Sequence, residues 1–380
     1  MTRYADLGVR PVINAAATLT RLGGSLMPLP VLEAMAAGAE SYVDMPELQR
    51  RVGERIAAMT HNEACYVSSG AAAGMAIAVA GCIAGRDLDC VRRLPHVDGP
   101  APEVVVYRKQ RNGYDQAARQ TGARLIEVDE RSAAALDAAI SPRTVCVLYF
   151  AGAHVAAGAL PLEDVVSVAH ARRIPVLVDA AAQIPPLSSL WRFTCELGAD
   201  AAIFSGGKGL RGPQASGLLL GTRAIVENCI ANGPPNHSLG RPMKVGKEEM
   251  MGLLAAVEWS LQQDEDDILG GYEATVRRWL EGLRGLPGVS VERGYPSEAG
   301  QPHARAVVHI GPTAVTTRAE LVAALWDGDP RIAVGEVEPD AVALNPQTLE
   351  PGEDEIVLQA MRRLLGSRAR STATGDQTVL

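Results

Sequence analysis

One lysine in this chain has unusual neighbours. Lys208 lies in a Ser-Gly-Gly-Lys-Gly run, residues 205–209, directly after the apolar run 202–204. Small residues let the backbone bend sharply and let a bulky ligand approach it closely. A carboxylate, Asp179, ends the β-branched and apolar run 174–178 that comes earlier in the chain. Open α/β sheets bind their ligands at the carboxyl ends of strands, so both side chains are candidates for one site.

A lysine and an aspartate after two successive strands fit the chemistry of pyridoxal 5'-phosphate (PLP). Lys208 would form a Schiff base with the cofactor aldehyde, and Asp179 would keep the pyridine nitrogen protonated so that the ring accepts electrons. Each residue alone has a structural alternative, as a solvated turn lysine or as a helix cap. Their order and the strands before them favour the joint interpretation.

A strand, a turn of small residues and a helix follow one another near residue 70. The strand-like run 64–67 leads into Ser69-Gly70-Ala71 and an Ala-rich stretch that ends near Gly85. This arrangement presents backbone N–H groups and the positive end of a helix dipole to an anion. Close helix–sheet packing would give the same composition, but the position before Asp179 and Lys208 favours a phosphate cradle. The predicted site therefore holds the phosphate, the ring nitrogen and the aldehyde.

A residue that stacks on the cofactor ring is expected in the polar turn after the strand-like run 103–107. The candidates in this turn are Gln110, Arg111 and Tyr114. For each of them, a place in a solvated basic loop is an equal alternative.

Strand-like and helical segments alternate along the first two thirds of the chain. Strand-like runs occupy residues 64–67, 103–107, 124–128, 144–150, 174–179, 200–204 and 216–220. This rhythm predicts an α/β fold with a seven-stranded, mostly parallel sheet that helices cover on both faces. A long helical stretch, about 248–284 and interrupted at Gly270-Gly271, is predicted to lead into a smaller α+β domain. The acidic run 264–267 inside it is interpreted as a solvated helix face or turn.

Four segments are predicted from these patterns. They are an N-terminal arm and helix (1–44), a large PLP-binding domain (45–245), a small C-terminal domain (246–366) and a mobile tail (367–380). In the small domain, the strand-like runs are 289–291, 306–310 and 332–334, and the helical runs are 318–326 and 353–365.

The composition limits the classes of binding partner that we expect. The 380-residue chain has a formal net charge of −8 and no long basic run, which disfavours nucleic acid. Its longest uncharged apolar stretch, 71–85, is too short to span a bilayer, and the first residues lack a signal-peptide layout, so we expect a cytoplasmic protein without a membrane partner. The six cysteines and seven histidines show no metal-ligand spacing, so no metal site or disulfide framework is predicted.

The segments around Asp179 and Lys208 resemble those of a known superfamily. It is the selenocysteine synthase (L-seryl-tRNA selenium transferase)-like superfamily of fold-type I PLP enzymes, and the chain is most similar to the branch that contains D-glucosaminate-6-phosphate ammonia-lyase. The residues that carry the resemblance are 178–186 and 204–217, with further matches at 13–15, 22–25, 47–49 and 243–249. The resemblance implies the fold-type I PLP-dependent transferase fold.

The resemblance also implies roles for individual residues. Lys208 would carry the internal aldimine and Asp179 would face the pyridinium. Cofactor contacts are implied for Ser69, Gly70, Ala71 and Ser205 at the phosphate, for Gln183 near the ring oxygen or substrate, and for Gln110 where family members often place a stacking histidine.

Members of the superfamily form obligate dimers or larger homo-oligomers with sites at the subunit boundary. By resemblance, Thr20, Ser25, Arg211 and Lys244 would then serve the neighbouring subunit's phosphate or substrate. A substrate carboxylate also calls for an arginine, because guanidinium pairs with it bidentately. The candidates are Arg331, Arg211 and Arg21, each with a surface or structural role as its alternative.

These observations together predict a PLP-dependent lyase for a small amino acid or amino-sugar acid. Lys208 would remove the α-proton, and loss of a β-substituent would give an enamine that hydrolyses to a 2-oxo acid and ammonia. An amino acid racemase or epimerase, or an aminotransferase, remains open, because each starts from the same carbanion. A racemase needs a second acid, for which Tyr66, Tyr114 and His154 are candidates.

Two further classes are disfavoured. A selenium transferase acting on tRNA would carry an added N-terminal region, whereas here the catalytic pattern begins by residue 11 and the chain is acidic. A non-catalytic binding protein with this fold would be expected to have lost Lys208 or Asp179, and both are present.

Overall fold

A computed structural model describes residues 3–152 and 157–366 of the chain. The described residues form two compact units. The large unit comprises Gly23–Ile268 and Glu298–Pro302, and the small unit takes in the described residues up to Leu22, Leu269–Ser297 and those from His303 onward. These limits differ from those of the four segments predicted above, and the division into four domains stays a prediction. His154 and the tail 367–380 lie outside the described residues.

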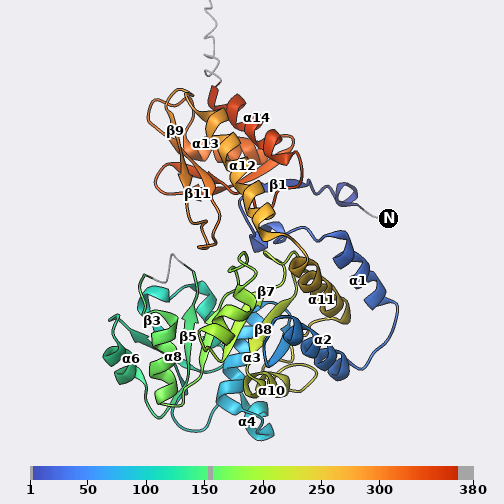
Figure 1. Ribbon diagram of the computed structural model, residues 1–380, viewed down its shortest axis with the longest axis vertical. Coiled ribbons are helices and arrows are strands. Elements are labelled where there is room, and N and C mark those ends of the chain that lie inside the picture. Colours follow the sequence, from blue (N-terminus) through green and yellow to red (C-terminus); the bar gives the residue numbers. More distant parts are fainter. Residues whose placement is uncertain (1–2, 153–156, 367–380) are drawn as a thin grey trace, which may run out of the picture. The chain divides into compact units, whose positions relative to one another are not determined.

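A seven-stranded sheet lies at the centre of the large unit (Figure 1). Its strand order is β2-β8-β7-β6-β5-β3-β4. The strands are β2 (Ala64–Ser68), β3 (Glu103–Tyr107), β4 (Arg124–Val128), β5 (Thr144–Phe150), β6 (Val176–Asp179), β7 (Ala201–Ser205) and β8 (Gly217–Gly221). Strand β8 runs antiparallel to β2 and β7, and the other neighbouring strands pair in parallel. The predicted α/β class and mostly parallel sheet are confirmed.

Helices bury both faces of this sheet. The helices on one face are α2 (Met45–Met59), α6 (Ala133–Ala139), α8 (Leu162–Ala171) and α11 (Lys247–Leu261). Those on the other face are α3 (Ala71–Ala84), α5 (Gln116–Arg119) and α10 (Arg223–Asn232). In β6, Val176 and Val178 point into the first core and Leu177 into the second, because successive side chains of a strand alternate between faces. An apolar strand without alternation therefore suits this central position.

The small unit has its own sheet, with the order β1-β11-β12-β10-β9. The strands are β1 (Val12–Ala15), β9 (Val289–Gly294), β10 (Arg305–Ile310), β11 (Arg331–Val337) and β12 (Ala341–Leu344). Its core also takes in side chains of α12 (Glu265–Leu283), α13 (Arg318–Asp327) and α14 (Glu353–Gly366). Strand β1 pairs in parallel with β11, Val12 opposite Arg331. The first strand of the chain is thus part of the sheet built mainly from the last third.

Further helices and helical turns complete the described chain. The remaining α-helices are α1 (Leu29–Ala39), α4 (Leu88–Arg93) and α9 (Ser189–Trp191). Helical turns of 3-10 type lie at Tyr4–Leu7, Thr20–Leu22, Arg108–Gln110 and Gly113–Asp115, and a π turn lies at Arg192–Glu196. None of the described helices combines the length and apolarity needed to cross a bilayer.

The predicted interruption at Gly270-Gly271 is wrong. Helix α11 ends at Leu261, α12 begins at Glu265, and both glycines lie inside α12. The Asp264 carboxylate accepts hydrogen bonds from the backbone N–H groups of Asp266 (3.0 Å) and Asp267 (3.2 Å). The acidic run therefore caps a helix start, which offsets a cost of about 1 kcal/mol for each interior glycine.

Candidate active site

Asp179 and Lys208 lie at the carboxyl ends of neighbouring strands, and these strand ends form one edge of the large sheet. Asp179 is the last residue of β6, and its register partner on the parallel strand β7 is Ile203. The loop with Lys208 leaves the end of β7 at Ser205. Both side chains therefore lie at the carboxyl ends of neighbouring strands, where the sequence predicted them.

Burial shifts both groups towards their neutral forms. It raises the pKa of the Asp179 carboxyl, although the Ala181 N–H, 3.0 Å from Oδ1, and the Lys208 ammonium oppose the shift. Burial also lowers the pKa of Lys208, and the attraction of Asp179 opposes that shift. A lysine with a lowered pKa supplies a neutral amine more readily, and that is the nucleophilic form.

The backbone of the lysine loop is packed too closely for side chains. A Cβ atom on Gly207 would lie 2.5 Å from the Cα atom of Gln214. A Cβ atom on Gly209 would overlap the carbonyl oxygen of Ile184. The glycines on either side of Lys208 are thus required by close backbone approach.

Two predicted substrate-binding residues hold this loop. The Ser25 hydroxyl donates to the Gly207 carbonyl oxygen (3.1 Å). The Arg211 Nε donates to the Leu26 carbonyl oxygen (2.7 Å). The segment with Ser25 and Leu26 is therefore hydrogen-bonded to the lysine loop on both sides of Lys208. Their contact with a substrate stays a prediction.

The predicted phosphate cradle is an open helix start at the same sheet edge. Gly70 is the N-cap of α3, with φ +136°, and no side chain caps the helix. Gly217 is the register partner of both Ser68 and Ser205. A Cβ atom on Gly217 would lie 2.9 Å from the Ala71 nitrogen. Because no side chain caps α3 and Gly217 has none, the backbone N–H groups of the first turn of α3 stay open. This set of donors fits a phosphate.

Of the ring-stacking candidates, Gln110 lies nearest to this edge. Its side chain is fully buried; Nε2 donates to the Phe150 carbonyl oxygen (3.2 Å), and Oε1 accepts from the Phe150 N–H (3.1 Å). Phe150 is the register partner of Asp179. Arg111 pairs instead with Asp115 and Glu127, and Tyr114 is 64% exposed. Contact between Gln110 and the ring stays a prediction.

A cavity of about 160 Å³ lies beside the cradle. Lys244 and Arg241 line it, together with Gln49 and Tyr66. The Ser69 hydroxyl donates to the carbonyl oxygen of Met243, next to Lys244 (3.0 Å). The sequence analysis did not predict Arg241 and Gln49 as site residues. The signal for this region was the family resemblance of segments 47–49 and 243–249.

Thr20, Arg21 and Arg331 belong to the small unit. The Arg331 Nε donates to the Trp326 carbonyl oxygen (2.8 Å), and its guanidinium lies 4.5 Å from the centroid of the Trp326 ring. The Arg21 guanidinium lies over the same ring at 5.9 Å. Two of the three arginines predicted to bind a substrate carboxylate therefore lie against the same indole ring. Their role toward a substrate stays a prediction.

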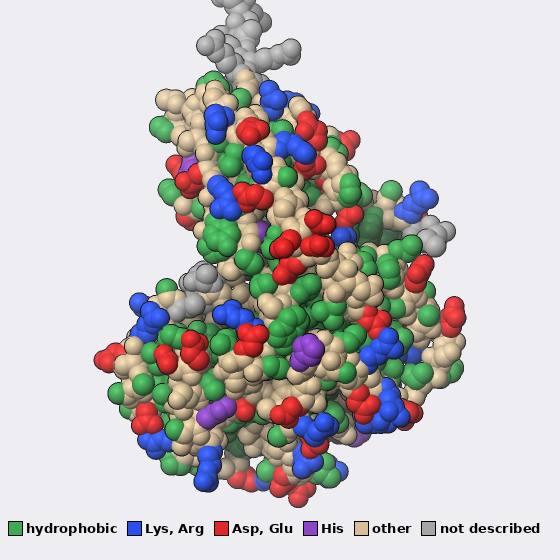
Figure 2. All heavy atoms as spheres, viewed as in Figure 1, with side chains coloured by type: hydrophobic (Ala, Val, Ile, Leu, Met, Phe, Trp, Pro, Cys, Tyr) green, Lys and Arg blue, Asp and Glu red, His purple; other side chains and the backbone are tan. Residues whose placement is uncertain are grey.

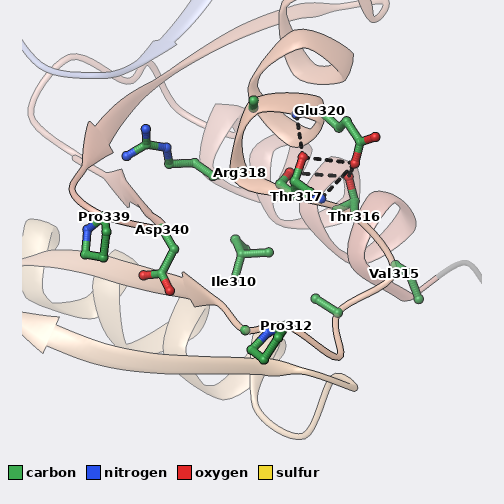
Figure 3. Close-up of a pocket in the computed structure, with 12 residues that line it drawn as sticks. Ile310, Pro312, Val315, Thr316, Thr317, Arg318, Glu320, Pro339 and Asp340 are labelled. Carbon is green, nitrogen blue, oxygen red and sulfur yellow. Dashed lines mark hydrogen bonds between the residues drawn. The ribbon is translucent and has the colours of Figure 1, made fainter.

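A second pocket, of about 450 Å³, lies in the small unit at the start of α13 (Figure 3). Thr317 Oγ1 accepts from the Glu320 N–H (3.3 Å), and the Glu320 carboxylate accepts from the Thr317 N–H (2.9 Å). Arg318 pairs with Glu338 (3.0 Å). Because Thr317 and Glu320 satisfy each other's backbone N–H groups at this helix start, it does not offer the open donors of the α3 cradle. Among the described residues, no cluster of three or more His, Cys, Asp or Glu side chains is placed to hold a metal ion.

Known proteins resemble this chain over nearly its full length. It is 31% identical over 373 residues to D-glucosaminate-6-phosphate ammonia lyase of Salmonella typhimurium, covering 95% of this chain and 97% of that protein. The chain belongs to the selenocysteine synthase-like superfamily of fold-type I PLP enzymes. Within this superfamily it is 27% identical over 407 residues to an L-seryl-tRNA(Sec) selenium transferase of Nitratidesulfovibrio vulgaris, covering 94% of this chain and 82% of that protein.

Further comparisons agree. The aminotransferase class-V family matches residues 107–243. The chain is also 31% identical over 391 residues to a 5'-C-glycyluridine monooxygenase-decarboxylase of a Streptomyces species, covering 98% of this chain and 94% of that protein. The solved structure of D-glucosaminate-6-phosphate ammonia-lyase has a TM-score of 0.84 and 30% identity, and the match covers 97% of this chain and 100% of that one. The predicted superfamily and branch, the PLP cofactor and the lyase class are confirmed.

Proposed function

We propose that the chain eliminates ammonia from a small amino acid or amino-sugar acid and releases a 2-oxo acid. The placement of Lys208, Asp179 and the open start of α3 at one sheet edge carries this proposal. PLP, once bound, supplies an electron sink for a carbanion. The residues proposed to hold it are Lys208, Asp179, Ser69, Gly70, Ala71, Ser205, Gln110 and Gln183.

Lys208 is the proposed base. Burial lowers its pKa, so a larger fraction of Nζ is neutral near neutral pH and able to take the substrate α-proton. The buried Asp179 carboxyl, whose pKa is raised, would gain a cationic partner in the protonated ring nitrogen. That attraction favours the carboxylate and offsets its desolvation.

The substrate's second anionic group is proposed to enter the cavity beside the cradle. Arg241 and Lys244 supply two positive charges there, and the volume of about 160 Å³ suits a small terminal group. A guanidinium and an ammonium favour a phosphate or carboxylate. We therefore favour an acidic or phosphorylated amino-sugar acid, the class named in the ammonia-lyase relative, over a simple β-hydroxy amino acid.

A homodimer or larger homo-oligomer is proposed from the surface around α1. One side of this region packs on α11, where Lys247 Nζ donates to the Gly38 carbonyl oxygen (2.8 Å). The other side exposes large apolar residues close in sequence to Ser25. They are Leu26, Leu29, Leu32, Tyr42 and Val43. Such a cluster favours a protein interface, and a second copy would bring its own Ser25 near it.

Nucleic acid and membrane partners are not proposed. Figure 2 shows basic side chains interspersed with acidic ones over the face drawn, and the net charge is −8. A cytoplasmic location is proposed because all six cysteines are unpaired thiols and three of them, Cys65, Cys146 and Cys229, are buried. Unpaired thiols are typical of a reducing compartment.

Oxygen-dependent decarboxylation is a second candidate, favoured by the relative from Streptomyces at the same identity. A racemase has less support. Tyr66 is 3% exposed and lines the cavity assigned above to the substrate's second anionic group, and that assignment gives it no role as a second acid at the α-carbon. Tyr114, 64% exposed, is open to solvent.

The test is a substrate panel with the PLP-loaded protein. It contains D- and L-β-hydroxy amino acids and amino-sugar acids with and without phosphate. Ammonia, 2-oxo acid, carbon dioxide and dissolved oxygen are measured. Equal amounts of ammonia and oxo acid without oxygen uptake support the proposal. Oxygen uptake with carbon dioxide supports the second candidate, and α-proton exchange without product supports a racemase.

A further inference from the structure

The connection between β9 and β10 carries a short tip, Glu298–Pro302, that belongs to the large unit. The Gln301 side chain is 2% exposed, and its Nε2 donates to the Ile184 carbonyl oxygen (2.9 Å). The Ala299 carbonyl oxygen accepts from Gln183 Nε2 (2.9 Å). Two amide-to-carbonyl bonds therefore join this tip to consecutive residues of another segment.

The segment that the tip holds starts at Asp179 and touches the lysine loop. The Ala181 N–H donates to Asp179 Oδ1 (3.0 Å). At Ile184, the carbonyl group lies so close to Gly209 that a Cβ atom there would overlap it. The acceptor of Gln301 is thus also the surface against which the backbone next to Lys208 rests.

The far end of the same segment is fixed separately. The Leu187 N–H donates to Glu265 Oε1 (2.6 Å). Between Asp179 and Leu187, the bond from Gln301 holds the Ile184 carbonyl, while Gln183 donates through its backbone N–H to Ala180 (3.0 Å) and through its side chain to Ala299 (2.9 Å). A buried carbonyl that loses a hydrogen-bond donor carries a desolvation penalty, so we expect the backbone at Ile184 to move when Gln301 is lost.

We propose that Gln301 is a positioning residue for Lys208 and Asp179, acting through the Ile184 carbonyl that it holds against Gly209. This inference rests on the proposed function, in which Lys208 and Asp179 bind the cofactor. Gln301 itself is given no chemical step. It fixes the segment between the two groups, and the tip that carries it belongs to the same unit as the site.

The experiment compares Gln301→Ala and Gln301→Glu with a matched control, Asn62→Ala. The glutamate keeps the shape of the side chain and removes the N–H donor. Asn62 Nδ2 also donates to a distant carbonyl oxygen, that of Leu190 (2.8 Å), so its loss imposes a similar structural cost. Two readouts in the cofactor-free protein are used: amide hydrogen exchange of residues 180–187, and the pH dependence of the rate at which added PLP attaches to Lys208.

In both Gln301 variants, the amide hydrogens of residues 180–187 are expected to exchange on the order of tenfold faster than in the parent protein. Their PLP attachment profile should move to higher pH, because water reaching Lys208 returns its lowered pKa towards the ordinary value. Asn62→Ala should lose stability without either change. If the Gln301 variants match Asn62→Ala in both readouts, the proposal is overturned.

The parent protein separates this test from the proposed function. Attachment of PLP to the parent at a residue other than Lys208 would contradict the proposed function, whatever the variants do. Attachment at Lys208 with unchanged profiles in the Gln301 variants would overturn only the positioning role. If Gln301→Ala does not fold, Gln301→Glu supplies the same two readouts.

Discussion

Two helix starts in this protein are built in opposite ways. At α13, Thr317 and Glu320 bond each other's backbone N–H groups and close the helix end. At α3, Gly70 stands in the capping position and no side chain caps the helix. The first arrangement stabilises the helix. The second leaves N–H donors open to a ligand at the edge that holds Asp179 and Lys208, so a missing cap is the functional signal.

The largest expected effect comes from the group that the open helix start serves. Lys208→Ala should lower the rate of product release by about a thousandfold or more, because both the covalent link and the base are lost. The exposed residue Lys109 offers the control, and Lys109→Ala should keep the parent rate. Steady-state assay on the best substrate of the panel measures both. A Lys208→Ala protein that retains a tenth of the rate would contradict the assignment.

Placing a negative charge at the open start of α3 should make it resemble the closed one. Ser69→Asp is expected to weaken PLP binding about 10- to 100-fold, since a carboxylate repels the phosphate and competes for the N–H groups. Ser69→Ala is the control for loss of the hydroxyl and its bond to Met243, and it should weaken binding less. Equilibrium titration of the cofactor-free protein gives both constants. Equal affinities for the two variants would remove the cradle from the account.

The buried pair predicts how stability depends on pH in the cofactor-free protein. The folded pKa of Asp179 is raised above its ordinary value of 3.8, so the folded state binds more protons and this group destabilises the fold as pH rises above that value. Asp179→Asn should therefore be more stable than the parent at neutral pH, with the difference disappearing near pH 3. Urea unfolding at several pH values measures it. A variant less stable at neutral pH would contradict the sign.

The smallest effect is expected at the closed helix start. Thr317→Ala removes the cap of α13 and should lower the free energy of unfolding by about 1 kcal/mol. PLP affinity should stay at the parent value, because the helix start already satisfied its own donors. Thermal unfolding and cofactor titration test the two statements together. A change in cofactor affinity similar to that of Ser69→Asp would erase the distinction between the two helix starts.

The sequence predicts the elements that end at the site. The apolar runs before Asp179 and Lys208 have the composition of buried parallel strands, and small residues follow each of them. Local patterns of this kind reveal the three parts of the site, because each part lies within one strand and its following turn. The glycines beside Lys208 also indicate the site, because the close approach of other backbone segments leaves no room for side chains there.

Other features depend on contacts between distant residues, which one sequence does not reveal. Strand β1 pairs with β11 more than 300 residues later, so the first residues looked like an arm. Strand β12 has only four residues, too few for periodicity to separate it from a loop. The bond from Gln301 to Ile184 joins residues 117 apart, and nothing in either segment announces it.

The most direct test of the account is to locate the cofactor on the chain. The protein is loaded with PLP, treated with borohydride, digested and analysed by mass spectrometry. We predict one modified peptide, the one that contains Lys208, and loss of the modification in Ser69→Asp at limiting PLP. Modification of Lys109, Lys244 or Lys247 instead, or no modification at saturating PLP, would contradict the claim that the open start of α3 and the lysine loop form one cofactor site.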